Sequence, residues 1–446
     1  MTVSSMNAGA RRLAAAARVI DYCREVFPVR GLIVSPDIER AFVALQGRFP
    51  ELTIHRYPSG SIVEDWEVPL AWEAVDGVLE DESGRLLAGL QDSFLFVAPY
   101  SEPVDGWFTK NEVAAHARTA PSHSGSFSLE HRNAYNYQLV DWGITLPLNV
   151  VTQMSNSGRY HVRIHTRTTP GNLCVAEAVL PGRRPEMICI CSQFDELCND
   201  GQASAVFAAE LFRWLGTLPN RQFTYQLLLV PELVGTLFFA SSNREQLGRT
   251  VAMLDLETLG AGERWVLKRG LGQRCSLEQA LKIALRDLNA DHRVCGFFEG
   301  YGNDERVYGW PTIGIPGPAL QRYPFSEYHT DLDTPDILDR ALLEEAFTIC
   351  ERTLLMLEKN HVPAFTTFLP PWLTKHGLYV DAAMGADAFR MNNELLFGID
   401  GTRSLLSLCD ELGLPFEPTE EYLRRFVEKG LVKTREPTFE ELRTGG

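Results

Sequence analysis

The sequence predicts an α/β protein whose largely parallel sheet carries helices on both faces. Between residues 145 and 355, short apolar runs alternate with helix-like stretches, which is typical of strand–helix–strand units. Residues 53–105 instead contain short alternating runs separated by Gly, Pro and Asp, and residues 393–434 contain two helical stretches around a Gly-Leu-Pro turn. These observations predict a smaller β-rich unit and a C-terminal helical unit beside the α/β core.

Within the α/β region, strands and helices are predicted from their length and apolar periodicity. The strand candidates are Tyr160–Thr166, Leu173–Leu180, Met187–Cys191, Thr224–Val230, Val251–Leu256 and Thr312–Ile315. The helix candidates are 203–216, 235–247, 276–289 and 337–358.

The chain is predicted to divide into three units. Residues 1–56 and 111–365 form the α/β domain, and residues 57–110 form a small β-subdomain inserted into it, with DESGR as a hairpin turn. Residues 380–446 are predicted to form a winged helix-turn-helix. Its helix TEEYLRRFVEK mixes Glu with Arg and Lys, whereas a DNA-binding helix presents a net basic face, so packing or protein interaction is favoured over DNA binding.

The composition agrees with a globular protein of this class. The 446 residues are 45% hydrophobic and 22% charged, and the net charge of −16 argues against nonspecific nucleic-acid binding while allowing cation binding. Nine cysteines without CxxC or disulfide-framework spacing predict reduced thiols in a cytoplasmic protein. Arg18 and Asp21 interrupt the Ala-rich start, so we expect an amphipathic first helix there, and no membrane partner is expected.

Four stretches place polar residues at expected strand ends or in nearby loops. Asp195 and Asp200 lie in CSQFDELCNDGQAS, Glu232 in LLLVPELVGT, Asp255 in VAMLDLETLG and His329 in SEYHTDLDT. A carboxylate directly after a buried strand is costly unless it is paired or binds a metal. Two Asp and one His suit zinc or a similar divalent ion, and a neighbouring Glu that is not a ligand is what water activation requires.

Each of these residues also has a simpler interpretation. Asp200 alone could cap the following helix, which is the favoured interpretation for a single Asp. Glu232 could pair with an arginine, Asp255 could cap or pair, and His329 could be an ordinary surface or core histidine. The ordered set as a whole favours one crevice at the carboxyl ends of the strands.

The order of the motifs resembles the zinc aminopeptidase family that includes bacterial leucyl aminopeptidase and glutaminyl cyclase. It resembles still more closely a subgroup of aminopeptidase-like bacterial proteins with an inserted small β-domain and a C-terminal winged helix. The matching stretches cover nearly the whole chain and are YPSGSIVEDWEVPLAWE (57–73), PELVGT (231–236), GYGNDERVYGWPTIGIP (300–316), SEYHTDLDT (326–334) and FGIDGTRSLLSLCDELGLPF (397–416). The resemblance implies a zinc exopeptidase-like fold.

The resemblance also implies a role for each candidate residue. Asp200 corresponds to the carboxylate that bridges both ions in two-metal members, and Glu232 corresponds to the general base. Asp255 and His329 correspond to ligands of one metal and of the other. Contacts to substrate are expected from Asp304, Glu305, Tyr328, Gln193 and Asp195, where Glu305 stands in place of a histidine of the broader family.

Two family ligands have no counterpart in this sequence. The first histidine falls on the region of Gln193, and the second glutamate falls on Leu233. The remaining Asp200, Asp255 and His329 could hold one divalent metal, which we expect to be zinc, with Mn or Fe as alternatives. Additional ligand atoms could come from the carbonyl of Gln193 or from a thiolate of Cys191 or Cys198.

The sequence therefore predicts a metal-dependent, aminopeptidase-like hydrolase with an incomplete metal site. Its substrate would be an amide of a short peptide or of an aminoacyl metabolite. The alternative is a degenerate, metal-poor member that binds or scaffolds, or that has altered chemistry on an aminoacyl substrate. A homo-oligomer is expected only because members of the family often self-associate.

Overall fold

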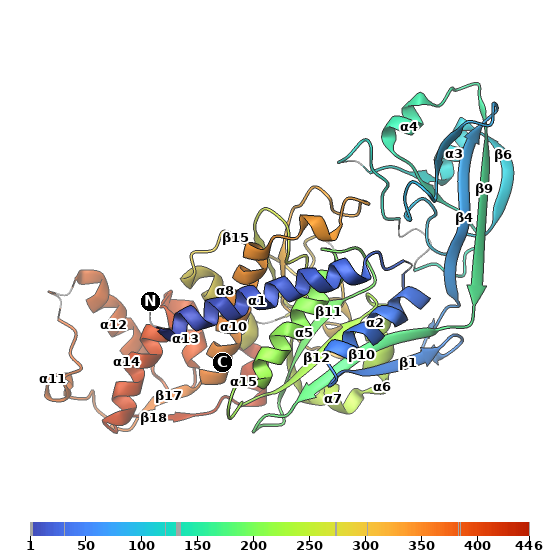
Figure 1. The fold of residues 1–446 in the computed structure, drawn as a ribbon. Coiled ribbons are helices and arrows are strands. Elements are labelled where there is room, and N and C mark those ends of the chain that lie inside the picture. Colours follow the sequence, from blue (N-terminus) through green and yellow to red (C-terminus); the bar gives the residue numbers. More distant parts are fainter. Residues whose placement is uncertain are drawn as a thin grey trace.

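A computed structural model describes residues 3–30, 32–120, 122–130, 135–272, 274–300, 302–381, 383 and 385–445. Its centre is an eight-stranded sheet in the order β1-β10-β12-β11-β13-β16-β14-β15 (Figure 1). The strands are β1 (Thr53–Pro58), β10 (Asn172–Leu180), β11 (Met187–Gln193), β12 (Thr224–Val230), β13 (Thr250–Glu257), β14 (Trp265–Lys268), β15 (His292–Cys295) and β16 (Ala319–Arg322). The four inner strands β12, β11, β13 and β16 run parallel, so their carboxyl ends meet at one edge.

Helices cover both faces of this sheet. Alternate residues of β11 point to opposite sides, so Ile188 and Ile190 join the larger core, while Cys189 and Cys191 join a smaller one. The larger core includes α1 (Val3–Val26), α2 (Pro36–Arg48), α5 (Gln202–Gly216), α8 (Ser276–Asp287) and α10 (Arg340–Lys359). The smaller core includes α6 (Val234–Ser242) and α9 (Glu305–Tyr308), and α7 (Arg244–Arg249) follows α6. The predicted fold class, with its largely parallel sheet and two helical faces, is confirmed.

One predicted strand is wrong. Residues 311–313 form a turn and residues 314–318 have no regular structure, so Thr312–Ile315 is not a strand. Pro316 and Pro318 lack the N–H that a central ladder needs. The strand β16 accordingly begins directly after Pro318, at Ala319.

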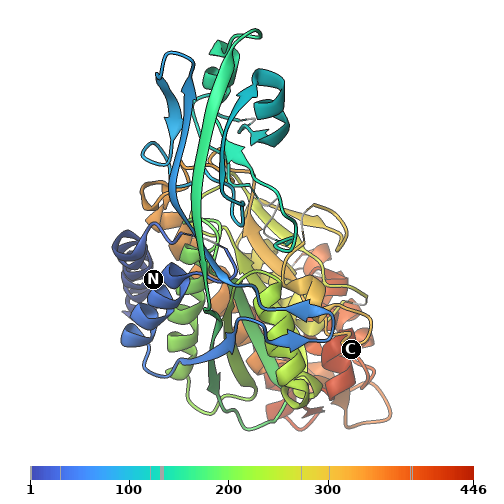
Figure 2. The same ribbon diagram turned by 90° about the vertical axis from the view of Figure 1, so that its right-hand side faces the viewer.

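A second, four-stranded sheet stands away from the core in the order β5-β4-β9-β6 (Figure 2). It is formed by β4 (Ala71–Asp81), β5 (Leu86–Gly89), β6 (Val104–Thr109) and β9 (Arg159–Thr169). Short elements accompany it, namely β2 (Ile62–Val63), β3 (Trp66–Glu67), α3 (Lys110–His116), β7 (Ala117–Arg118), β8 (Ile144–Thr145) and α4 (Leu148–Gln153). The boundaries 57–110 for an inserted subdomain stay a prediction. The second sheet also contains β9, which lies beyond residue 110, and β1 of the central sheet extends to Pro58.

The C-terminal part packs against the end of the core. It contains β17 (Val362–Phe365), α11 (Leu373–His376), α12 (Ala386–Gly398), α13 (Leu405–Leu412), α14 (Phe416–Glu428), β18 (Val432–Arg435) and α15 (Phe439–Thr444). The strands β17 and β18 pair antiparallel, and Arg286 of α8 donates to the backbone of Cys409 and Leu414. The winged-helix assignment of residues 380–446 stays a prediction. No helix within the described ranges is long and apolar enough to cross a membrane.

Candidate metal centre

The candidate residues gather where the inner strands end. Asp200 lies in the loop between β11 and α5, and Glu232 follows β12. Asp255 is part of β13, where it lies beside Cys191 of β11. His329 comes from the loop between β16 and η1 (Pro335–Ile337), which precedes α10.

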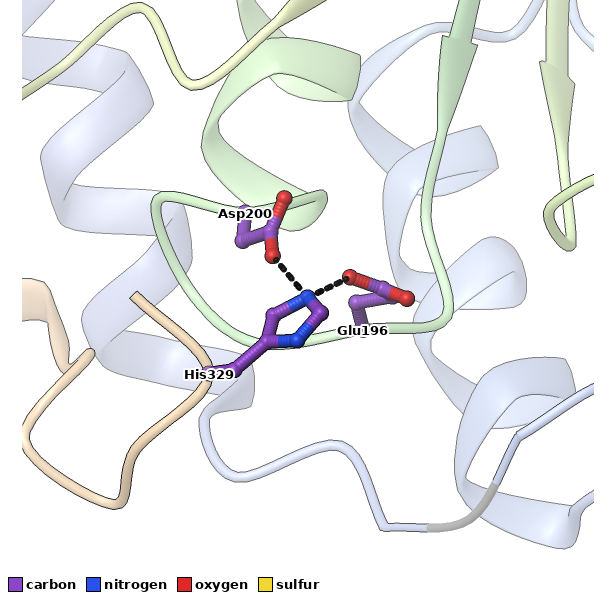
Figure 3. Close-up of side chains that lie close together, drawn as sticks. All are labelled: Glu196, Asp200 and His329. Carbon is purple, nitrogen blue, oxygen red and sulfur yellow. Dashed lines mark ion pairs between the residues drawn. The ribbon is translucent and has the colours of Figure 1, made fainter. Parts of the chain in front are cut away.

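Glu196, Asp200 and His329 form the first cluster of possible ligands (Figure 3). The imidazole Nε2 of His329 lies 3.0 Å from Asp200 Oδ2 and 3.5 Å from Glu196 Oε2. Both carboxylates are buried and come from the same loop, and they point to the same nitrogen of the ring. Tyr328 stacks on His329 with ring centroids 3.8 Å apart, which fixes the plane of the imidazole.

Asp333 anchors the loop that carries this cluster. Its carboxylate accepts hydrogen bonds from the backbone N–H of Asn199 at 2.7 Å and of Asp200 at 3.0 Å. The side-chain oxygen of Asn199 in turn accepts from the N–H of Gly260 at 2.8 Å. Asp333 thereby ties the loop of Asp200 to the segment that carries His329.

We expect Asp333→Asn to lower the free energy of unfolding by about 1–3 kcal/mol, because the amide can accept from only one of the two buried N–H groups. Chemical denaturation measures this change. The exposed Asp336→Asn serves as the control and should leave stability unchanged. Equal stability of the wild type and Asp333→Asn would contradict the anchoring role.

Glu232 is held beside the first cluster by its own backbone and by a tyrosine. Its N–H donates to Asp195 Oδ1 at 2.8 Å, and Tyr135 donates its hydroxyl to Glu232 Oε2. Burial, followed by the negative charge of Glu196, raises the pKa of Glu232 well above its usual value. The next residue, Leu233, adopts a left-handed backbone with φ 57°, a strained conformation for a non-glycine residue.

Asp255, Glu257 and Glu305 form a second cluster, with one oxygen of each within 4.8 Å of the others. Lys268 pairs with Glu305 at 2.6 Å, and both side chains are almost fully buried. Asp255 is 1% exposed, and neither of its carboxylate oxygens has a hydrogen-bond partner among the described residues. The structure thus brings Asp200 and His329 together but places Asp255 with other carboxylates.

The remaining predicted residues have different surroundings. Asp195 accepts from the N–H groups of Ile33 and Glu232, and Asp304 accepts from the N–H of Leu233 and the hydroxyl of Thr236. Both side chains are buried, although Asp195 also borders the cavity described below, and substrate contacts for them stay a prediction.

Gln193 occupies the region where the resemblance places a histidine. Its Nε2 donates to Asp200 Oδ1 at 3.3 Å, and its Oε1 has no partner among the described residues. The orphaned oxygen is consistent with an additional weak ligand.

The electrostatics of the first cluster favour a bound cation. Burial, followed by repulsion from Glu196, raises the pKa of Asp200 to about 7. Burial lowers the pKa of His329, but its contacts with Asp200 and Glu196 outweigh burial and raise that pKa to about 11. Two carboxylates therefore surround one imidazole nitrogen and attract positive charge to it. Two carboxylates and an imidazole form a donor set that fits one zinc or similar divalent ion.

A cavity of about 740 Å³ lies between the core and the second sheet and borders the first cluster at Glu196. Asp200 and His329 are not among the residues that line it. Its walls include α2, Trp72 of β4, Phe94 and Glu196. The volume lies in the range of small-molecule sites.

Sequence comparison identifies the family of the chain. Residues 20–360 match the family described as Domain of unknown function (DUF4910). The chain belongs to this family. A protein of Clostridium acetobutylicum, provisionally described as a polysaccharide biosynthesis protein with an aminopeptidase-like domain, is 24% identical over 411 residues, which are 89% of this chain and 92% of that protein.

Solved structures show the same fold. A crystal structure provisionally described as a peptidase from Clostridium acetobutylicum matches this DUF4910 chain with a TM-score of 0.79 and 23% identity, over 96% of this chain and 98% of that one. A zinc aminopeptidase of Bacillus subtilis matches with a TM-score of 0.57 and 13% identity, over 77% and 94%. An aminopeptidase of Aneurinibacillus sp. strain AM-1 matches with a TM-score of 0.52 and 15% identity, over 78% and 96%. The chain therefore has an aminopeptidase-like fold.

Proposed function

We propose that this DUF4910 protein is a metal-dependent, aminopeptidase-like hydrolase that cleaves an amide of a short peptide or an aminoacyl compound. The observation that carries the proposal is the meeting of Glu196, Asp200 and His329 beside Glu232 at the carboxyl edge of the sheet. The first three would hold one divalent ion, with zinc preferred because a histidine is present. The cavity that borders Glu196 has the volume of a small-molecule site and would admit a short peptide or an aminoacyl compound.

The residues of the chain would divide the reaction as follows. A bound divalent ion would supply the Lewis acidity that activates water and polarises the amide carbonyl. Glu232 would accept the proton of the attacking water and pass it to the leaving amine. The raised pKa of Glu232 suits this second step, because a carboxyl group that holds a proton more tightly can carry it to the nitrogen.

A metal-poor binding protein is the second candidate. It is favoured by Gln193 and Leu233, which stand at the two positions where the resemblance places further ligands. Neither an amide nor an alkyl side chain binds zinc as histidine and glutamate do.

Metal analysis of the full chain separates the two candidates. The hydrolase proposal expects about one zinc per chain, loss of aminoacyl-amide hydrolysis on chelation and recovery when zinc is added back. A purified chain that takes up no Zn, Mn or Fe and hydrolyses no aminoacyl amide would overturn the proposal in favour of the binding protein.

Tyr135→Phe should move the acidic limb of the pH profile of kcat/KM to higher pH by roughly one unit. The hydroxyl of Tyr135 donates to the Glu232 carboxylate and so lowers its pKa, opposing burial and the charge of Glu196. Removing that donor raises the pKa of Glu232, and a base must be ionised to act. The profile of the variant measures the shift.

Tyr137→Phe is the matched control, because the hydroxyl of Tyr137 donates to the backbone carbonyl of Glu67 and not to a carboxylate. Its profile should equal that of the wild type. An acidic limb that stays in place in Tyr135→Phe would show that Tyr135 does not set the pKa of the base.

A further inference from the structure

His329 has a backbone conformation that the surrounding structure must hold in place. Its φ is 53°, in the left-handed region that residues other than glycine seldom adopt. Such a conformation persists only where neighbouring contacts fix it. The stacking of Tyr328 on the imidazole comes from the adjacent residue of the same loop, so the position of the loop depends on contacts with other segments.

One of these segments comes from the second sheet and its short accompanying elements, which together are called the second-sheet unit. Residues 127–130 lie between β7 and β8 and form an antiparallel bridge with the residues after His329. The N–H of Leu129 donates to the carbonyl of His329 at 2.8 Å. The N–H of Asp331 donates to the carbonyl of Phe127 at 3.1 Å. The bridge therefore fixes the carbonyl of His329 itself.

The side chain of Asp331 strengthens this bridge. Its Oδ1 accepts from the N–H of Phe127 at 3.1 Å, so Asp331 both donates to and accepts from the backbone of the same residue. This double contact lies two residues after His329 in the chain. It closes the end of the bridge that the hydrogen bond from Leu129 begins.

The segment that pairs with His329 is firmly anchored. Phe127 and Leu129 are 6% and 7% exposed and belong to the hydrophobic core of the second-sheet unit, and the ring of Phe127 packs edge-on against Phe96. The same core contains Leu197, which follows Glu196 in the loop between β11 and α5. The second-sheet unit thus contacts both loops that supply the first cluster.

We propose that Asp331 is a positioning residue, which holds His329 in its ligand position through the bridge to residues 127–130. Asp331 acts through the backbone and makes the second-sheet unit part of the first metal cluster. The inference rests on the proposed function in that it takes His329 as a zinc ligand.

Asp331→Ala and Asp331→Asn form the test pair in the full chain. Alanine removes the acceptor of the Phe127 N–H, whereas asparagine keeps a side-chain oxygen that can accept it. Asp331→Ala should weaken zinc binding by roughly 10- to 100-fold, which is the cost of changing a group that supports a metal ligand. Asp331→Asn should bind zinc nearly as the wild type does. Competition with a chelating dye measures both affinities.

Hydrogen exchange in the metal-free chain gives a readout that needs neither zinc nor activity. The amide of Leu129 should exchange faster in Asp331→Ala than in the wild type, because the open bridge exposes its N–H, and Asp331→Asn should restore slow exchange. Asp81→Ala is the matched control. Asp81 accepts from the N–H of Ser83 in the turn between β4 and β5 of the same unit, so its loss should change neither the exchange of Leu129 nor zinc affinity.

A measurement on the wild type covers the case in which Asp331→Ala does not fold. Zinc bound by His329 should slow the exchange of the Leu129 amide, because a ligand that binds only the closed form stabilises it. Exchange of Leu129 that does not respond to saturating zinc would overturn the inference.

The outcomes for the variants are equally distinct. Wild-type exchange of Leu129 in Asp331→Ala, or faster exchange with unchanged zinc affinity, would overturn the positioning role. Asp331 also lines the cavity, so a higher KM at saturating zinc in both variants, with zinc affinity unchanged, would assign it to the substrate instead. A wild type that takes up no zinc would refute the proposed function, and the exchange of Leu129 in Asp331→Ala would still decide whether Asp331 holds His329.

Discussion

Replacing Glu232 with glutamine should lower kcat/KM for aminoacyl-amide hydrolysis by roughly 10²- to 10⁴-fold, which is the range that general acid–base catalysis contributes. The amide of glutamine has nearly the shape of the carboxyl group but accepts no proton. Asp195 receives the backbone N–H of residue 232, so the loop should keep its conformation in the variant. Glu232 is not part of either ligand cluster, so the zinc content should stay at the wild-type level.

The two measurements must be made on the same preparation, because a variant that loses zinc loses activity for another reason. Glu245→Gln, which changes an exposed glutamate of α7, is the control and should keep both activity and zinc. Wild-type activity in Glu232→Gln would remove Glu232 as the base. Loss of zinc together with activity would assign Glu232 to the metal site instead.

The fold could be predicted because its main signal is local. Buried strands such as β12 are continuous apolar runs, and the predicted range Thr224–Val230 is the observed one. The short strands β14 and β15 carry no comparable run, and their pairing with the sheet depends on contacts between distant segments. Such contacts leave no periodicity in a single sequence.

The residues of the candidate site that lie at or near the carboxyl ends of strands could be predicted from the sequence. Asp200 and His329 lie far apart in the chain, yet both follow from the rule that chemistry gathers at the carboxyl edge of a parallel sheet. Glu257 was also within reach of the sequence, since alternation along β13 puts it on the face of Asp255.

Other parts of the site had no signal in the sequence. Glu196 stands beside Asp195 in an irregular loop, where no periodicity tells which of two neighbouring carboxylates turns inward to His329. Tyr135 reaches Glu232 from a segment next to the second sheet. Both positions depend on tertiary contacts rather than on a local pattern.

Glu196→Gln should weaken zinc binding by at least about 100-fold, since even residues that only support metal ligands cost 10- to 100-fold when changed. The substitution removes one of the two negative charges that face Nε2 of His329 and leaves Asp200 as the single carboxylate there. Activity should fall with zinc occupancy and return as zinc is raised toward the new dissociation constant. Competition with a chelating dye measures the affinity.

This recovery distinguishes a ligand from a catalytic group, because saturating zinc restores a site with a weakened ligand but cannot replace a proton acceptor. Glu351→Gln, which changes a buried glutamate outside both clusters, should bind zinc as the wild type does. If Glu196→Gln keeps wild-type zinc affinity, Glu196 is not a ligand, and Asp200 and His329 remain as the candidate ligands of this cluster. Leu233 stands where the resemblance places the second glutamate. Loss of zinc affinity in Glu196→Gln would mean that Glu196, in the altered loop, supplies the carboxylate that Leu233 lacks.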